Sequence, residues 1–535
     1  MPNSTAPSSA SGLPLTFDLL ARTPNEAAIG VLIPALDAAD TAIQLGALRA
    51  ILDRRSPVGQ REVLKRLHTA SHHWRAIIDE RRGRMTHALR DGVLGTEDQL
   101  CQNACQAILW FREYDLVPAL VTAMEDHDHS HCALLGSTLL GLADLLYEEL
   151  TQPRDYSNRR DPLLVRRNVT GSLEAAVRHH GKNSRREIID AFLMLAGRDN
   201  VTLKLILQDP HHVAYLPVVD ALLRNPRLGV MRLLLSYLED PHAPSAAISV
   251  LAHRSDRAFI EMLLERIGSE PSQQAASNLK RIDNIVWLRG NEAFVDQLDE
   301  AGQQGLLALV TASGMKRGDV LKLLERLLRG GTPGGRRAAA RALGAFNGAE
   351  ANALALVALE DSDPQVQATI VAQLRQRGIP GALGRLIDLV DHPDETVAAK
   401  ARESLSEFNF DRFVAAFDML DDEVRRSTGS LVKKVSPQAV ATVREEMQSL
   451  SRMKRLRALG IAEAMQAVGE LEDDIVGLLA DSDHLVRAEA ARVLGGSRSS
   501  AARAALQSAT SDRSPAVRDA AERTLERLSL PARVS

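Results

Sequence analysis

The chain has 535 residues, far more than a single hydrophobic core requires, so we expect either several domains or one extended repetitive body. Its formal net charge of −4 and pI near 6.5 argue against a dedicated nucleic-acid binder, because such proteins usually carry a strongly basic domain. Aromatic residues make up only 3% of a chain that is 45% hydrophobic, so the core must consist of Leu, Ala, Val and Ile, as in stacked helices.

Residues 1–14, "MPNSTAPSSASGLP", are predicted to form a disordered tail, because they lack the basic start and apolar run of a signal peptide. No stretch of 18 uncharged apolar residues follows, so we expect no contact with a membrane. The odd number of cysteines, Cys101, Cys105 and Cys132, without a CxxC spacing, fits a reducing compartment. A cytoplasmic protein is therefore expected, and its excess of arginine over lysine is typical of a GC-rich bacterial genome.

Residues 15–152 are predicted to form N-terminal helical repeats. Apolar residues spaced by four and eight lie on one stripe of a helix, as Ile43, Ala47 and Ile51 do. A second helical pattern, at i, i+3, i+4 and i+7, comprises Val117, Leu120, Val121 and Met124. Cys101 and Cys105 lie four apart in a helical stretch and are therefore interpreted as small core residues.

The segment "MEDHDHSHC", residues 124–132, contains many potential metal ligands. It aligns without a gap under "LADSDHLVR", residues 479–487, so we interpret it as the turn of another repeat, with Asp128 as the helix cap and His131 as a half-buried core residue. The alternative is a metal site formed by His127, His129 and His131. Alternating histidines at a helix start do not converge easily on one tetrahedral centre, so we expect no metal and no cofactor. Stoichiometric zinc in the purified protein would contradict this interpretation.

The middle of the chain shows weaker periodicity. Residues 153–170 are predicted to be an insertion or junction, because "TQPRDYSNRRDPLLVRRNVTG" contains helix breakers and lacks an apolar period. Residues 171–330 are predicted to form degenerate helical repeats. In them, Ala243, Ala247 and Leu251 form a stripe, and Asp240 before Pro241 is predicted to cap its helix.

Residues 331–530 show a repeat of about 31 residues, followed by a tail at 531–535. Each unit has a first helix, a polar turn, and a second helix with apolar residues four and eight apart. The clearest trios are Val366, Ile370 and Leu374; Val397, Ala401 and Leu405; Val486, Ala490 and Leu494; and Val517, Ala521 and Leu525; weaker copies are Gly335, Ala339 and Leu343, and Val424, Thr428 and Val432. Asp363 before Pro364 is predicted to cap its second helix. Neither helix of a unit can bury its stripe alone, so stacking on the next unit is expected.

These units resemble HEAT repeats of the armadillo-type superhelix. The family pattern has an Asp in the turn and a Val-Arg pair in the second helix, matched here by Asp481 with Arg487 and by Asp512 with Arg518. Asp361 is followed by Val366-Gln367 and so lacks the Arg. The resemblance implies that these residues form a structural ladder between neighbouring turns. It is strong over 333–530, patchy over 15–152 and weak over 171–330. Neither the W-x-x-L-G core of tetratricopeptide repeats nor the T-P-L-H-x-A of ankyrin repeats, the two alternatives of similar length, occurs.

The expected fold is thus all-α, an α-α superhelix (solenoid) of stacked antiparallel helix pairs. No H-E-x-x-H, G-x-S-x-G or G-x-G-x-x-G pattern is present, so we expect no enzyme. Catalysis on helical repeats does occur in bilin lyases and in glycosylases that remove alkylated bases from DNA, but no residues of this chain support either activity.

Two basic blocks are the candidate interaction surface. Residues 153–186 contain nine Lys or Arg against three Asp or Glu, and residues 425–457 contain nine against two. The candidates are Arg159, Arg160, Arg166, Arg167, Arg425, Arg426, Lys433 and Lys434. One interpretation is that arginines coat alanine-rich helices for solubility; the functional alternative is a groove for an acidic protein segment or a phosphate backbone. No interleaved aromatic residues are present to stack bases.

The sequence therefore predicts a non-catalytic scaffold or adaptor that binds another protein on the concave face formed by its second helices. The alternative is a repair or processing factor that binds a nucleic-acid backbone through the basic blocks, with steep salt dependence.

Overall fold

The computed structural model describes residues 12–153, 161–290 and 292–529. Within these ranges the chain is built from helices joined by short turns, and no strand occurs. The predicted all-helical class of paired, stacked helices is confirmed. None of the helices in these ranges is long and apolar enough to span a membrane.

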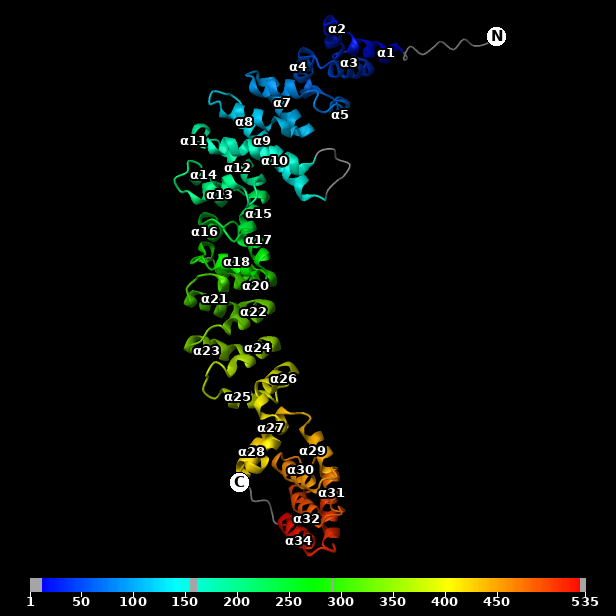
Figure 1. Cartoon of the computed structure of the whole chain (residues 1–535), viewed down its shortest axis with the longest axis vertical. Coiled ribbons are helices and arrows are strands. Elements are labelled where there is room, and N and C mark those ends of the chain that lie inside the picture. The colour runs from blue at the N-terminus through cyan, green and yellow to red at the C-terminus, as the bar shows by residue number, and fades with distance from the viewer. Residues whose placement is uncertain (1–11, 154–160, 291, 530–535) are drawn as a thin grey trace, which may run out of the picture. The chain divides into compact units, whose positions relative to one another are not determined.

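The chain divides into two compact units, one comprising Met1–Gln297 with Ala308–Lys316 and the other Leu298–Leu307 with Arg317–Ser535. In each unit the helices follow one another in chain order (Figure 1). We call the first of these compact units unit 1 and the second unit 2. Helix α20 (Glu300–Ala312) is divided between them.

Unit 1 contains nineteen labelled α-helices within the described ranges. They are α1 (Gly12–Arg22), α2 (Ala27–Ala35), α3 (Thr41–Arg54), α4 (Pro57–Lys65), α5 (His72–Glu80), α6 (Thr86–Leu94), α7 (Asp98–Phe111), α8 (Val117–Glu125), α9 (Cys132–Thr151), α10 (Pro162–Arg178), α11 (His180–Asn183), α12 (Arg186–Leu195), α13 (Val201–Gln208), α14 (Tyr215–Arg224), α15 (Leu228–Ser236), α16 (Ser245–His253), α17 (Arg257–Ile267), α18 (Gln273–Leu279) and α19 (Glu292–Gln297).

Unit 2 continues with α21 (Arg317–Gly330), α22 (Pro333–Leu343), α23 (Ala349–Ala358), α24 (Pro364–Leu374), α25 (Ala382–Leu389), α26 (Glu395–Ser404), α27 (Phe410–Ala416), α28 (Asp422–Val435), α29 (Ala439–Met447), α30 (Arg452–Ala464), α31 (Glu472–Leu478), α32 (His484–Val493), α33 (Ser500–Ala509) and α34 (Pro515–Ser529). Short 3-10 turns interrupt the two units at η2 (Leu67–Thr69), η3 (Tyr114–Leu116), η4 (Tyr237–Glu239), η5 (Val286–Leu288), η6 (Ser406–Phe408), η7 (Phe417–Met419) and η8 (Leu494–Gly496).

The predicted apolar stripes form the core of unit 2. The trios starting at Val366, Val397 and Val486 are buried, with no side chain of the three trios measurably exposed. In the last trio Val517 and Ala521 are buried and Leu525 is half-buried. Successive second helices pack on each other, α28 on α30, α30 on α32 and α32 on α34, which buries the stripe that one helix alone leaves exposed.

Helix α28 departs from its predicted stripe. Val424 is 41% exposed, and the buried face consists of Gly429, Val432 and Val435. A Cβ on Gly429 would lie 2.6 Å from the Ala464 carbonyl oxygen, so α28 approaches the end of α30 too closely for any side chain there. Of the predicted trio, Val432 is fully buried, Thr428 is half-buried and Val424 is exposed, so the buried face only partly coincides with the stripe that the four-residue spacing predicts.

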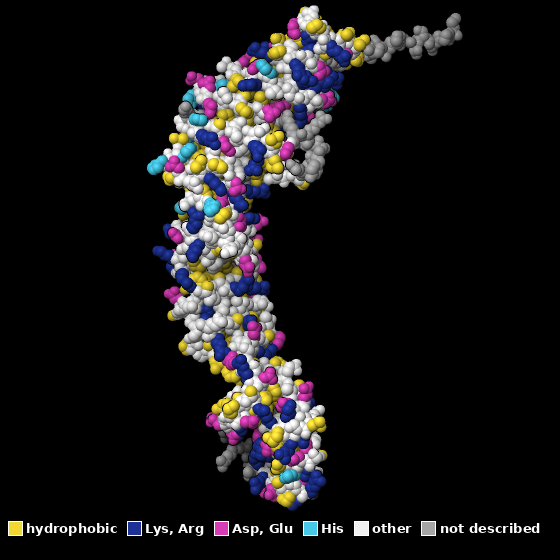
Figure 2. Space-filling model, in the orientation of Figure 1, with side chains coloured by type: hydrophobic (Ala, Val, Ile, Leu, Met, Phe, Trp, Pro, Cys, Tyr) yellow, Lys and Arg dark blue, Asp and Glu magenta, His cyan; other side chains and the backbone are white. Residues whose placement is uncertain are grey.

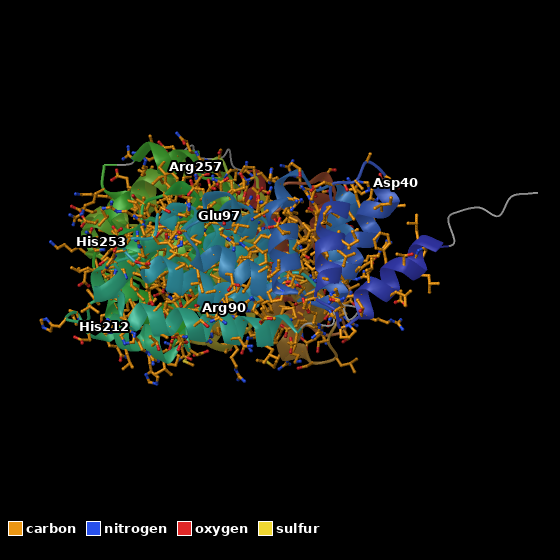
Figure 3. All side chains as sticks on the ribbon, turned by 90° about the horizontal axis from the view of Figure 1, so that it is seen from above. Asp40, Arg90, Glu97, His212, His253 and Arg257 are labelled. Carbon is orange, nitrogen blue, oxygen red and sulfur yellow. The ribbon has the colours of Figure 1, made fainter. Side chains whose placement is uncertain are left out.

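Polar turn residues start the second helices. Asp363 caps α24 by accepting a hydrogen bond from the Gln365 N–H at 2.9 Å, with Pro364 at the first helical position. In unit 1, Asp40 accepts from the Ala42 N–H at 2.7 Å at the start of α3 (Figure 3). Asp240 does not cap a helix as predicted, because α16 begins only at Ser245 and Asp240 bonds the His242 N–H inside the intervening turn.

Two predicted boundaries are wrong. Residues 162–170, assigned to a junction, form the first half of α10, because Asp161 caps the helix at the Leu163 N–H and Pro162 occupies its first position. Residues 12–14, assigned to the N-terminal tail, belong to α1. The rest of both segments, 1–11 and 154–160, and the predicted tail 531–535 lie outside the described residues.

Unit 1 buries one poorly compensated carboxylate. Asp190 on α12 is 9% exposed, its Oδ1 has no hydrogen-bond partner in the described structure, and Arg186 approaches Oδ2 only to 3.7 Å. Burial raises the pKa of Asp190 above its ordinary value, and a hydrogen bond from Asn225 offsets part of that rise. The ionised form is therefore unfavourable in the folded state.

Asp190→Asn is accordingly expected to raise the free energy of unfolding at pH 7 by about 1 kcal/mol, because the amide removes a buried charge. Since the folded-state pKa is raised, wild-type stability increases as the pH falls through that pKa towards the unfolded value. The advantage of the variant should therefore shrink between neutral and acidic pH. Urea unfolding of both proteins at pH 7 and pH 4 measures this, and an equal or larger gain at pH 4 would contradict it.

Candidate functional site

Two hollows of unit 2 lie along its last second helices, α28, α30, α32 and α34 (yellow to red in Figure 1). A hollow of about 580 Å³ is bordered by η7, α28, α30 and α32, and a second of about 570 Å³ by α30, α32 and α34. They share Leu456, Glu489 and Arg492, so they form one continuous depression. We call it the second-helix groove.

The helical period explains why this face is available. On α30 the residues Ala458, Leu459, Ile461 and Ala462 are buried in the core, whereas Met453, Lys454, Leu456 and Arg457 line the groove. Each second helix thus has one apolar face that packs against its neighbours and another face that is open to solvent or to a partner. Met453 is 66% exposed and Leu485, on α32, is 43% exposed. The groove therefore combines apolar and charged side chains.

An ion-pair cluster occupies the centre of the groove. Arg492 on α32 bonds both Glu463 oxygens at 3.0 and 2.6 Å and both Glu489 oxygens at 2.7 and 3.0 Å. The two carboxylates, Glu489 first, hold the pKa of the guanidinium above its ordinary value. The Arg492 guanidinium is therefore already paired with two carboxylates of the protein.

Arg425, a predicted interaction residue, faces inward. Its Nε donates to the Phe417 carbonyl at 2.7 Å, and its guanidinium lies 4.9 Å from the centre of the Phe417 ring. Arg425 therefore satisfies a carbonyl at the C-terminal end of α27, where Phe417 is the C-cap residue, and stabilises the wall of the groove. Its neighbour Arg426 is exposed and lines the groove.

The other predicted interaction residues are divided between the two units, and three of them have partners within the fold. Arg166 donates to the Leu195 carbonyl at 2.7 Å, Lys433 pairs with Glu470 and Lys434 pairs with Asp391. Arg167 is exposed on α10. Arg159 and Arg160 lie outside the described residues. Lys and Arg side chains alternate with Asp and Glu over the face that Figure 2 shows, as expected for solvated helix surfaces.

The turn Asp and second-helix Arg residues form a ladder in unit 2. Arg487, 4% exposed at its side chain, bonds both Asp512 oxygens at 2.9 Å, and its Nη1 donates to the Asp481 carbonyl of its own turn at 2.9 Å. Asp481 in turn pairs with Arg455 at 2.8 Å. Arg518, the last member, donates to the Asp512 carbonyl at 2.8 Å. Each rung links turns about 31 residues apart, so the ladder fixes the stacking of repeats.

The sequence analysis missed one other rung of the ladder. Arg336 pairs with Asp361 at 2.9 Å, although the pair Gly335-Arg336 stands where Val-Arg stands in the clearer repeats. One repeat later, Gln367 replaces the arginine and His392 the aspartate. Gln367 still donates to the Asp361 carbonyl at 2.7 Å, and His392 still accepts from the Asp394 N–H at 3.1 Å. Both bonds stay within their own turn, so Gln367 and His392 do not form a rung between the two turns.

The segment 124–132 is a turn, but it is longer than the gap-free alignment predicts. Helix α9 begins at Cys132 and Asp128 does not cap it; the N-cap residue is His131, which makes no side-chain cap bond. The difference lies at His129, which is 7% exposed. Its Nε2 bonds the Val93 carbonyl at 3.1 Å, so His129 is buried in the core and does not start the helix. His131 is half-buried, as predicted, and contacts Asp98 at 3.0 Å.

These histidines do not converge on one point with other ligands. His129 Nδ1 accepts the His131 N–H at 3.3 Å, so both of its ring nitrogens are used within the fold. Elsewhere, His212 and His253 (Figure 3) use Nδ1 within their own turn or helix. Across the ranges the structure describes, no three His, Cys, Asp or Glu side chains are placed to hold a metal ion.

Comparison with solved structures gives matches of low identity. A crystal structure of an engineered protein has 16% identity and a TM-score of 0.18, covering 94% of this chain and 99% of its own. A second engineered protein has 18% identity and a TM-score of 0.17, covering 50% and 96%. Human deoxyhypusine hydroxylase in complex with glycerol has 18% identity and a TM-score of 0.17, covering 56% and 95%. No curated protein sequence matches the chain significantly.

The family model described as HEAT repeats matches residues 320–406 and 471–535. The first range includes the Arg336–Asp361 rung and the second the Arg487–Asp512 rung. Residues 320–406 and 471–535 of this chain are therefore HEAT repeats.

Proposed function

We propose that the protein is a non-catalytic scaffold whose second-helix groove holds a segment of another protein. The observation that carries the proposal is the groove itself, which runs over four successive second helices and exposes Met453 and Leu485 beside charged side chains. Exposed apolar side chains in a depression between polar rims are typical of protein interaction sites. Stacked repeats offer such a surface without any moving part.

The proposed scaffold acts in the cytoplasm, in keeping with the free thiols of Cys101, Cys105 and Cys132. Nucleic-acid binding, the alternative from the sequence, is less well supported because Arg425, Arg166, Lys433 and Lys434 of the basic blocks already have protein partners.

A photo-crosslinking amino acid at Met453 tests the proposal. The full-length variant is irradiated in a lysate of the source organism, and the adducts are treated with protease or nuclease. The control carries the same amino acid at Leu450, which is fully exposed near α30 but lies outside the groove. A protein adduct enriched at Met453 over Leu450 is the expected result. Nuclease-sensitive adducts alone, or equal labelling at both positions, would contradict the proposed function.

A further inference from the structure

We infer that the groove is selective for an acidic partner segment with apolar anchor residues; this rests on the proposed function and names the kind of partner. The starting point is the set of cations that line the two hollows. They are Arg425, Arg426, Lys454, Arg457, Arg492, Arg523 and Arg527. The carboxylates that line them are Asp418, Asp422, Glu463 and Glu489. Cations outnumber carboxylates, and some of these cations have protein partners whereas others do not.

Most of these cations already have protein partners. Arg425 and Arg492 are held as described above, Arg457 lies 3.8 Å from Asp418, and Arg527 donates to the Arg492 carbonyl at 3.3 Å. Arg426, Lys454 and Arg523 remain. All three are exposed, and none of their side chains makes a hydrogen bond or ion pair with any residue in the described part of the chain. They come from α28, α30 and α34, so they are distributed along the whole groove.

Apolar side chains lie between these cations. Met453 and the half-buried Leu456 are on α30, and Leu485 is on α32. Burying Met453 and Leu485 against a partner would remove apolar surface from water, which is the main source of affinity, while the cations select the charge of the partner. A segment with apolar residues on one side and carboxylates flanking them complements this pattern.

The groove carboxylates favour a peptide over a nucleic acid. Asp418 and Asp422 are 76% and 82% exposed at their side chains, although Asp418 lies 3.8 Å from Arg457 and Asp422 lies 3.3 Å from Arg425, so both carboxylates remain accessible on the wall. A phosphate backbone carries charge at every step and would pass close to them, whereas a peptide can place its carboxylates opposite Arg426, Lys454 and Arg523 only. The groove also offers one aromatic ring, Phe417, which is buried and covered by Arg425, so base stacking has no platform.

The size of the groove sets the length of the probe. Helices packed side by side lie about 8–10 Å apart, so four successive second helices span about 30 Å. A helical peptide of about 20 residues covers that distance at 1.5 Å per residue. The probe is therefore a fluorescein-labelled peptide of that length with Leu at i, i+3, i+4 and i+7 and Glu at the flanking positions.

The experiment measures fluorescence anisotropy of this peptide with the full chain. Comparison probes replace every Glu by Lys, or every Leu by Ser, and a single-stranded DNA of similar length tests phosphate binding. The acidic apolar peptide is expected to bind at least about tenfold more tightly than each of the other three. Affinity should fall when the ionic strength rises from low to physiological, because surface charges are screened.

Matched charge reversals locate the binding. R426E/K454E/R523E is expected to weaken binding of the acidic peptide at least about tenfold. The control R385E/R498E/R503E makes the same change of net charge at three exposed arginines of unit 2 that lie outside the groove and make no ion pair with described residues. It should change affinity less than about twofold. Circular dichroism and unfolding curves of both variants exclude a folding defect as the cause.

The outcomes separate this inference from the proposed function. Any one of four results would overturn the inference. They are failure of the acidic peptide to bind, equal binding of the Lys peptide, tighter binding of DNA, and equal effects of the two triple variants. If Met453 still forms a protein adduct in that case, the scaffold proposal stands and only the charge of the partner was assigned wrongly. If Met453 forms no protein adduct, the proposed function itself is wrong.

Discussion

Replacement of Arg254 by alanine is expected to lower the free energy of unfolding of unit 1 by about 3–5 kcal/mol. Arg254 is 1% exposed, although it follows the end of α16 in a polar turn. Its Nη1 and Nη2 donate to the Leu222 and Asn225 carbonyls at 2.8 Å, and its Nε pairs with Asp256 at 2.5 Å. Alanine would leave the two carbonyls at the end of α14 without these donors and would open a cavity.

Two further variants separate the causes of this effect. Arg254→Met keeps much of the volume but cannot donate hydrogen bonds, so it should be destabilising by nearly the same amount. Arg257→Ala removes a nearby arginine (Figure 3) that is 64% exposed and paired with Glu261 on the same helix, so it should change stability by less than about 0.5 kcal/mol. Chemical unfolding, with hydrogen exchange across α14 to α16, measures all three. Similar stabilities for Arg254→Ala and Arg257→Ala would refute the role of Arg254.

Replacement of Arg487 by alanine is expected to lower the stability of the C-terminal repeats by about 3 kcal/mol. The change breaks the bidentate pair with Asp512 in the next turn and the bond to the Asp481 carbonyl in the residue's own turn. Arg487 also lowers the pKa of Asp512 below its ordinary value. This carboxylate therefore stabilises the folded state above its unfolded pKa, and the contribution is lost as the pH falls through the lowered folded-state pKa. The variant should lack this part of the acid dependence.

Arg518 is the matched control for Arg487. It occupies the same position in the last repeat and makes the same bond to the carbonyl of its own turn, at 2.8 Å, but no ion pair with a carboxylate among the described residues. Arg518→Ala should therefore lower stability by only about 1 kcal/mol. Urea unfolding at neutral and acidic pH, with hydrogen exchange of the turn at 510–514, measures both variants. An effect of Arg487→Ala no larger than that of Arg518→Ala would show that the ladder does not stabilise the stack.

The segment 124–132 shows what an alignment of two repeats within the chain can and cannot predict. Its agreement with 479–487 correctly placed a turn between two helices, because polar residues interrupt two apolar periods there. It did not place the helix start, because the position of His129 depends on the Val93 carbonyl, which is 36 residues away in sequence. His484, at the aligned position, is exposed and begins α32. The same residue type is thus buried in one turn and solvated in another.

The basic blocks illustrate the same limit for the candidate site. A count of charges along the chain selected 425–457, which includes residues that line the groove, but it could not separate Arg425, which bonds Phe417, from Arg426, which is exposed. It also omitted Arg523, which is about 70 residues beyond the block and reaches the groove only because α34 packs on α32. Which cation is free depends on the partners that packing supplies.

The amino-acid sequence by itself determined the helix pairs and most of the buried stripes of the C-terminal part, because each depends on a spacing within one repeat or on the regular step between repeats. The ladder was expected only from the resemblance to HEAT repeats, and its Arg336–Asp361 rung was missed. The tertiary structure alone decided which face of α28 is buried, where α9 and α16 begin, and which charged side chains face the groove. These features depend on contacts between residues without a regular spacing, such as Gly429 with Ala464 and His129 with Val93, where a close backbone approach or a buried polar group outweighs the local pattern.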